Sequence, residues 1–143
     1  MNHITSPDTS DSTIEREIRA KGKTAPRVTP ADLQANIESE HYFTAQNGVD
    51  GGGAMVGQPT PEHQSLGLLT FCVLVLRNGF TVTGESACAS PENFDPEIGY
   101  KIARENAVQK MWPLMGYELK AKLHRKAEAV SSGLSPLRTG VST

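Results

Sequence analysis

The stretch FCVLVLRNGFTVTGES, residues 71–86, decides the fold of this chain. Two runs rich in β-branched and aromatic residues flank Asn78-Gly79, a dipeptide typical of the type I′ turn of a two-residue β-hairpin. Such a turn places Arg77 opposite Phe80 on one face of the ribbon. The first strand is apolar on both faces, and an isolated ribbon is marginal in water. We therefore expect other elements to cover both faces of the hairpin.

The composition predicts one small domain. The chain has 143 residues, of which 37% are hydrophobic, and a net charge of -2. This charge gives no overall attraction to nucleic acids or to anionic membrane surfaces. The longest apolar run, residues 66–76, is too short to span a bilayer. A core built from so few apolar residues is small, so we expect the chain to form a homo-oligomer.

Three segments are expected to lack regular structure. Residues 1–27 and 128–143 are rich in small and polar side chains, which favours disorder, with a helical turn at 14–18. Residues 46–61 contain several glycines and two prolines, which predicts a flexible loop. A glycine-rich phosphate cradle would need a strand directly before this loop and a helix directly after it, and neither is apparent. The predicted domain therefore spans residues 28–127.

A helix is predicted before the hairpin. Thr29, Pro30 and Asp32 supply an N-cap, a first helical residue and an acidic first turn. The helix is expected to end at Phe43. The order of helix, loop, hairpin and long helix predicts an α+β fold.

A long helix is predicted after the hairpin, because Asp95 and Pro96 form a second helix start. Helical spacing predicts that its inward row consists of Ile98, Ile102, Glu105, Gln109 and Trp112. Pro113 lacks a backbone donor, so it is expected to kink this helix or to start a new one. The buried positions beyond it would be Leu114, Tyr117 and Leu123.

Several segments in this region resemble a family of phage proteins. They are residues 69–88 around the hairpin, NFDPEIG at 93–99, and ARENA at 103–107 followed by Trp112. In this order they resemble the small phage and prophage proteins of the gene-49/gene-66 family, over residues 28–123. The resemblance implies an accessory protein of a tailed phage.

The predicted layout, a small sheet followed by long helices, is also similar to Thoeris anti-defence protein one. That group consists of oligomeric sponges that bind cyclic ADP-ribose signals. The similarity implies a non-enzymatic protein of the host cytoplasm that sequesters a cyclic-nucleotide-type immune signal and so counters host defence. The alternative is a protein-interaction module that binds and inhibits a host protein, a role that suits the acidic balance and the tails.

Five residues are candidates for binding such a nucleotide. The Phe80 ring could stack on a base while Arg77 pairs with a phosphate, or the two could form a plain cross-strand pair. Asn93 could recognise a ribose or a base edge, or cap a local turn. Arg104 and Glu105 lie on the second helix, where a polar group on an apolar face is costly unless paired. Their alternative role is a structural network or a pair between subunits.

The chain carries no catalytic or metal signature. Cys72, Cys88 and the four histidines lack the spacing of a metal site, so we expect reduced core thiols, no metal and no cofactor. We do not expect an enzyme or a membrane partner. The basic residues of 101–125 are more typical of solvated helix faces than of a nucleic-acid surface. The apolar segment 112–115 could serve as core or as a seam between subunits.

Overall fold

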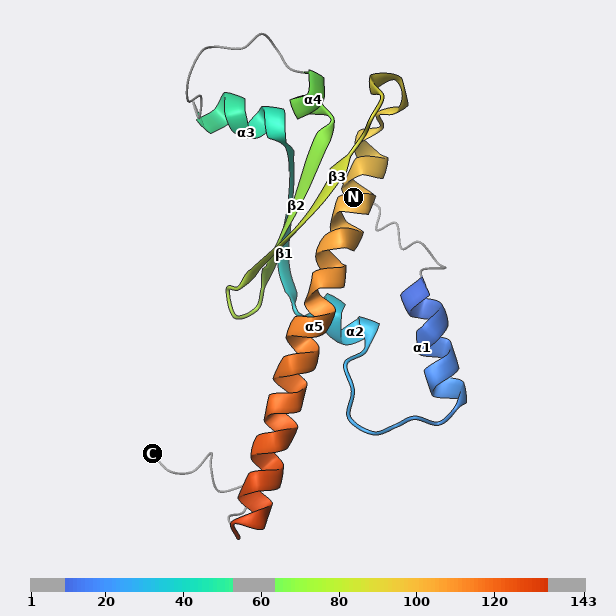
Figure 1. The fold of residues 1–143 in the computed structure, drawn as a ribbon, viewed down its shortest axis with the longest axis vertical. Coiled ribbons are helices and arrows are strands. Elements are labelled where there is room, and N and C mark those ends of the chain that lie inside the picture. The colour runs from blue at the N-terminus through green and yellow to red at the C-terminus, as the bar shows by residue number, and fades with distance from the viewer. Residues whose placement is uncertain (1–9, 53–63, 134–143) are drawn as a thin grey trace. The chain divides into compact units, whose positions relative to one another are not determined.

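The computed structural model describes residues 10–52 and 64–133, and its class is α+β, as the sequence predicts (Figure 1). In chain order the elements are α1 Ser10–Ala20, α2 Pro30–Ala35, β1 Ile37–Thr44, α3 Ala45–Gly52, α4 Gln64–Gly67, β2 Leu69–Leu76, β3 Thr81–Ala87, the 3-10 helix η1 Pro91–Asn93, and α5 Pro96–Ser131. The chain divides into two compact units. One is Leu33–Met111, which holds the sheet, and the other consists of Met1–Asp32 and Trp112–Thr143.

β2 is the central strand of a three-stranded antiparallel sheet of order β1-β2-β3. The prediction of a helix up to Phe43 is wrong, because Ile37–Thr44 forms β1 and pairs with β2. The start of that helix is confirmed. The amide of Thr29 donates to the Asp32 carboxylate at 2.9 Å, and the amide of Asp32 donates to the Thr29 hydroxyl at 3.1 Å. The helix, α2, ends at Ala35. The side chains of β1 favour a strand, and the apolar central strand β2 requires a pairing partner. Together these effects outweigh the helical spacing that predicted a helix up to Phe43.

The hairpin forms at the predicted dipeptide, but with a three-residue turn. The amide of Leu76 donates to the carbonyl of Phe80 at 2.8 Å, and the amide of Gly79 donates to the carbonyl of Leu76 at 2.9 Å. Gly79 has a φ of 86°. The φ of Asn78 is negative, as it is for every non-glycine residue that the structure describes. A type I′ turn is therefore excluded. The geometry is that of a type I turn closed by a left-handed glycine.

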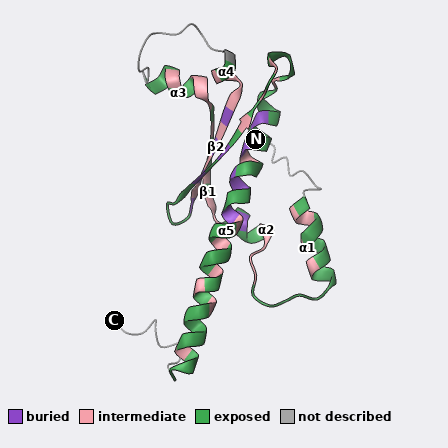
Figure 2. Ribbon diagram, in the orientation of Figure 1, coloured by how far each residue is buried: buried purple, intermediate pink, exposed green. Residues whose placement is uncertain are grey.

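This turn shifts every cross-strand partner by one residue from the predicted register. Cys72 pairs with Gly84, and Leu74 pairs with Val82. Because paired residues share a face, Val82 and Gly84 join the Cys72–Leu74 row of β2 instead of the opposite row. This row is the covered face of the sheet: Cys72 and Leu74 are fully buried, and Val82 is 6% exposed. Figure 2 shows buried positions, in purple, on the sheet and on the first half of α5.

Helix α5 covers this face by direct backbone contact. A Cβ atom on Gly84 would lie 2.1 Å from the carbonyl oxygen of Ala103 and 2.3 Å from the amide nitrogen of Ala107. Only glycine permits such an approach, so Gly84 sets the distance between helix and sheet. The buried residues of α5 are accordingly mostly small: Gly99, Ala103, Ala107, Val108 and Met111.

The predicted inward row of α5 is therefore wrong. Ile98 and Ile102 are 54% and 44% exposed, and Glu105 and Gln109 are also exposed. The prediction selected large apolar residues, whereas the close approach to β3 admits small ones. Since Glu105 lies in solvent, its carboxylate carries no burial cost that a partner would have to offset.

The opposite face of the sheet is only half-buried, although the sequence predicts cover on both faces. Phe71, Val73 and Val75 of β2 are all of intermediate exposure. Phe43 of β1 stacks on Phe71 with ring centroids 5.5 Å apart. At this end of the sheet α3 and α4 lie against one another and against β2 (Figure 1).

Two segments predicted to be irregular contain helices. Residues 10–20 form α1, which is longer than the predicted turn at 14–18. Residues 45–52 form α3, whose start is capped reciprocally by Thr44 and Asn47 at 2.9 and 3.1 Å. The rest of the predicted loop, residues 53–61, lies outside the described residues, as do residues 1–9 and 134–143 of the predicted tails.

In the second unit, α1 is held by polar contacts. Arg27 binds the carboxylate of Glu15 through both of its terminal nitrogens, at 2.6 and 2.7 Å. These hydrogen bonds hold the pKa of Glu15 at about 2, below its usual value of 4.5. The indole N–H of Trp112 donates to Asp11 at 3.2 Å, which joins α1 to the second half of α5.

Helix α5 is continuous across Pro113, so a new helix does not start there. Two of the positions predicted to be buried beyond the proline are exposed: Leu114 at 41% and Tyr117 at 79%. Trp112 and Met115 are half-buried. The role of segment 112–115 as a seam between subunits stays a prediction.

Candidate functional site

Arg77 is held by the end of α2. Its Nε donates to the carbonyl of Ala35, and its backbone amide donates to the carbonyl of Asn36 at 3.0 Å. Ala35 is the last residue of α2, where carbonyl groups lack helical partners, so the guanidinium acts as a helix cap. The predicted pairing of Arg77 with Phe80 is wrong, because Leu76 faces Phe80 across the turn. Phe80 is 55% exposed.

Arg104 is also held within the fold. Its Nε pairs with the carboxylate of Glu40 on β1, and its Nη2 donates to the side chain of Gln34 on α2 at 2.6 Å. This geometry is the structural network that the sequence allows for Arg104. Glu105, the next residue of α5, is exposed to solvent.

The group beside Arg104 is unsuited to nucleophilic chemistry. Cys72 and Tyr42 lie opposite one another on β2 and β1, and Tyr42 packs on Tyr100 with ring centroids 5.1 Å apart. Burial raises the pKa of the Cys72 thiol to about 11 and also raises the pKa of Tyr42. Both groups are therefore protonated at neutral pH, whereas a cysteine nucleophile acts as thiolate.

Asn93 lies apart from these arginines. It ends η1, just before α5, whereas Arg104 lies eight residues into the helix, about 12 Å along its axis. Arg77 and Arg104 each bind a residue at the end of α2, Ala35 and Gln34 respectively, whereas Asn93 lies in η1 before the start of α5. The structure does not gather the five predicted residues into one site, and their role as nucleotide ligands stays a prediction.

A pocket of about 130 Å³ lies at the start of α5. Its walls include the ends of β2 and β3, η1 and the first turns of α5. Its lining residues include Thr70, Asn93, Phe94, Ile98, Gly99 and Ile102. Of the residues that the sequence singled out for binding, only Asn93 lines it.

Thr70 is the unusual member of this pocket. It is 1% exposed, and its Oγ1 has no hydrogen-bond partner in the structure. Most buried hydroxyl groups have a partner, because leaving one unpaired costs free energy. In the sequence, Thr70 is distinguished only as the one hydroxyl-bearing residue of the apolar run 66–76.

Two other polar groups that line the pocket, Asp95 and Cys88, have partners within the chain. The carboxylate of Asp95 accepts from the amides of Glu97 and Ile98 at 2.9 and 3.3 Å, which caps the start of α5. The thiol of Cys88 donates to the carbonyl of Ser90 at 3.1 Å. The helix start is thus already satisfied by a negative charge, which disfavours an anionic ligand.

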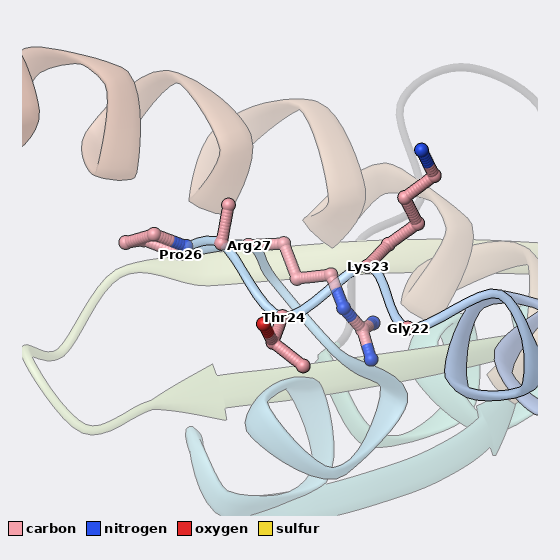
Figure 3. Close-up of a pocket in the computed structure, with 6 residues that line it drawn as sticks. Gly22, Lys23, Thr24, Pro26 and Arg27 are labelled. Atoms are coloured by element: carbon pink, nitrogen blue, oxygen red, sulfur yellow. The ribbon is translucent and has the colours of Figure 1, made fainter.

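A larger hollow, of about 350 Å³, lies in the second unit (Figure 3). It is lined by six consecutive residues, Gly22 to Arg27, so it is the inside of one loop. Its only arginine, Arg27, already binds Glu15. We assign no site to it.

The described residues contain neither a metal-binding cluster nor a membrane-spanning helix. Within residues 10–52 and 64–133, no three histidine, cysteine, aspartate or glutamate side chains are grouped so that they could hold a metal ion. In the same part of the chain, no helix is both long enough and apolar enough to cross a membrane.

The fold and the pocket define a small α+β protein in which one helix rests directly on a three-stranded sheet. Residues 28–123 match the family model described as Phage protein (N4 Gp49/phage Sf6 gene 66) family. This match covers more than half of the chain, and the chain therefore belongs to this family of phage proteins. The chain matches no curated protein and no solved structure.

Proposed function

We propose that this phage protein is a non-enzymatic accessory protein that acts by binding a protein of the host. Its binding surface would be the α5 patch, which we define as Phe94, Ile98 and Ile102 around the pocket. The observation that carries the proposal is the exposure of Ile98 and Ile102, at 54% and 44%. Four residues apart, they share one face of α5. Exposed apolar side chains gathered beside a pocket are typical of protein interfaces.

Capture of a cyclic-nucleotide signal has less support from the geometry of one protomer. Small-molecule sites usually have volumes of about 300–1,000 Å³, and the pocket at α5 has about 130 Å³. Arg77 and Arg104, which would pair with phosphates, bind groups of their own chain. Nucleotide capture would therefore depend on a pocket formed between subunits of a homo-oligomer, which stays a prediction.

Site-specific photo-crosslinking in host cells tests the proposed function. A photoreactive residue at position 98 is expected to give a crosslinked host protein. The matched control is position 117 on the same helix, where Tyr117 is 79% exposed and lies outside the α5 patch. The substitutions Ile98→Glu and Ile102→Glu are expected to abolish binding of the partner so identified. Equal amounts of crosslinked host protein from positions 98 and 117 would contradict the proposal. A crosslink only between two copies of this chain, seen as a product of twice the chain mass, would also contradict it.

A further inference from the structure

We infer that the outer edge of β1 pairs with the same edge of a second copy of this chain, antiparallel and across a two-fold axis at His41. This pairing joins the two three-stranded sheets into one continuous sheet. Three features of β1 carry the inference: backbone groups without a partner, strand ends that fix the register, and aromatic rings on both sides of the edge.

The backbone of β1 points alternately toward β2 and away from it. Leu76 forms the hydrogen bonds that close the hairpin turn, so the even-numbered residues of β2 face β3 and the odd-numbered ones face β1. His41 pairs with an odd-numbered residue of β2 and faces it. Its neighbours Glu40 and Tyr42 therefore direct their amides and carbonyls outward. No described residue forms a hydrogen bond with these outward groups.

The outer edge of β3, in contrast, is engaged by α5. The outward carbonyl of Glu85 accepts from the side-chain amide of Asn106 at 2.8 Å, and its carboxylate pairs with Lys110 at 3.9 Å. Ile98 and Ile102 share the face of α5 that carries Asn106, so the α5 patch lies toward β3. Of the two edges of the described sheet, β1 is the open one, and pairing there leaves the α5 patch free. The inference therefore does not depend on the proposed function.

Both ends of the open row on β1 are closed. At one end, a bulge between Ile37 and Ser39 interrupts the regular pairing. At the other end, the amide of Thr44 donates to the side chain of Asn47 at 2.9 Å, where α3 begins. The regular free edge thus consists of residues 39–43, and His41 is its midpoint. A two-fold axis at the midpoint gives the longest overlap of two such edges.

This axis gives every outward group a partner. It places Glu40 opposite Tyr42 of the second copy, and Tyr42 opposite Glu40 of the second copy, so the two strands exchange backbone hydrogen bonds in both directions. The carboxylate of Glu40, which pairs with Arg104 of its own chain, then meets a tyrosine. An axis moved to Glu40 would place two carboxylates directly opposite one another, which disfavours that register. The edge is thus complementary to itself.

Aromatic side chains flank this edge on both faces of the sheet. On one face, Phe43 stacks on Phe71 and is 38% exposed. On the other face, Tyr100 packs on Tyr42 and is 39% exposed. A strand added to β1 covers part of both rings, so pairing buries apolar surface and satisfies the backbone at the same time.

Disulfide crosslinking of the purified chain tests the inference. The parent for this test is Cys88→Ser, because the other native thiol, Cys72, is fully buried. Across the proposed axis the Cα atoms of the two residues 41 lie about 4.5 Å apart, a distance that a disulfide can bridge. Oxidation of His41→Cys is therefore expected to give a covalent dimer. The matched control is Ser39→Cys on the same face of β1, whose two copies would lie about 14 Å apart and remain uncrosslinked.

Light scattering measures the same association without a crosslink. We expect the parent to have twice the chain mass. His41→Glu sets two carboxylates opposite one another and is expected to weaken association about fivefold. Ser39→Glu, which faces Phe43 of the second copy, is expected to weaken it less.

Three results would overturn the inference. They are a monomeric mass at every concentration, a dimer in which His41→Cys does not crosslink, and equal crosslinking of His41→Cys and Ser39→Cys. A dimer without the crosslink at position 41 would place the contact between copies elsewhere on the chain. The crosslinks to a host protein from position 98 are measured separately, so failure of this inference and failure of the proposed function are distinguishable.

Discussion

The two halves of α5 differ in burial, because all of its buried residues lie at or before Met111 and no described residue beyond Met111 is buried. In the first half, Pro96–Met111, the buried positions are mostly glycine and alanine, while Ile98 and Ile102 face solvent. In the second half, large apolar residues such as Leu114 and Tyr117 are exposed. Burial along this helix therefore follows the surface that packs against it rather than the hydrophobicity of the residue. A helix that rests on the backbone of β3 buries small residues because only they fit.

The strongest way to break this arrangement is to add one methyl group to β3. Gly84→Ala places a Cβ atom 2.1 Å from the Ala103 carbonyl oxygen, so helix and strand must separate. We expect the free energy of unfolding to fall by about 3 kcal/mol or more. Chemical denaturation followed by circular dichroism measures the change. The control is Gly116→Ala in the second half, where no atom lies within 4 Å of the new methyl group. This substitution is not expected to lower the free energy of unfolding.

A second pair of substitutions compares the two halves directly. Ala103→Leu overpacks the buried row and is expected to cost about 1–3 kcal/mol. Leu114→Ala removes a much larger apolar group from an exposed position, and we expect a change within about 0.5 kcal/mol. Urea denaturation of both variants under one set of conditions gives the comparison. A larger loss for Leu114→Ala would mean that a partner covers the second half.

The sequence predicts the hairpin and both helix starts, because these features depend on local chemistry. Asn78-Gly79 produces a turn, and Thr29 and Asp32 cap α2 as expected. The register does not follow from the dipeptide alone. The turn lies against the end of α2, where Arg77 binds the carbonyls of Ala35 and Asn36, and this contact is not local in sequence.

The extent of β1 and the inward face of α5 could not be derived in the same way. β1 combines a helix start upstream with strand-favouring residues, and only its pairing with β2 decides between them. The buried row of α5 depends on the lack of a side chain at Gly84, a residue of another element. The candidate site also depends on tertiary packing. Thr70 and Ile98 line one pocket only after β2 and α5 pack together.

Removing the unpaired hydroxyl is expected to have a smaller effect, and a favourable one. Thr70→Val keeps the shape of the side chain and deletes the buried Oγ1 that has no partner. We expect the free energy of unfolding to rise by about 1 kcal/mol. Thermal unfolding of the variant beside the wild type measures the rise. A fall in stability would mean that Thr70 is hydrogen-bonded in the free protein, for example through a bound water molecule.

The smallest effect concerns the second unit and depends on pH. Because Arg27 lowers the pKa of Glu15 to about 2, the ionised carboxylate stabilises the α1 contact above pH 4.5, and this contribution is lost as the pH falls toward 2. We expect the NMR signals of α1 to change with a midpoint near 2. Glu15→Gln should abolish that transition, because the amide does not titrate. A midpoint near 4.5 in the wild type would mean that the contact between Arg27 and Glu15 does not persist in solution, and that α1 is held by Trp112 and Asp11 instead.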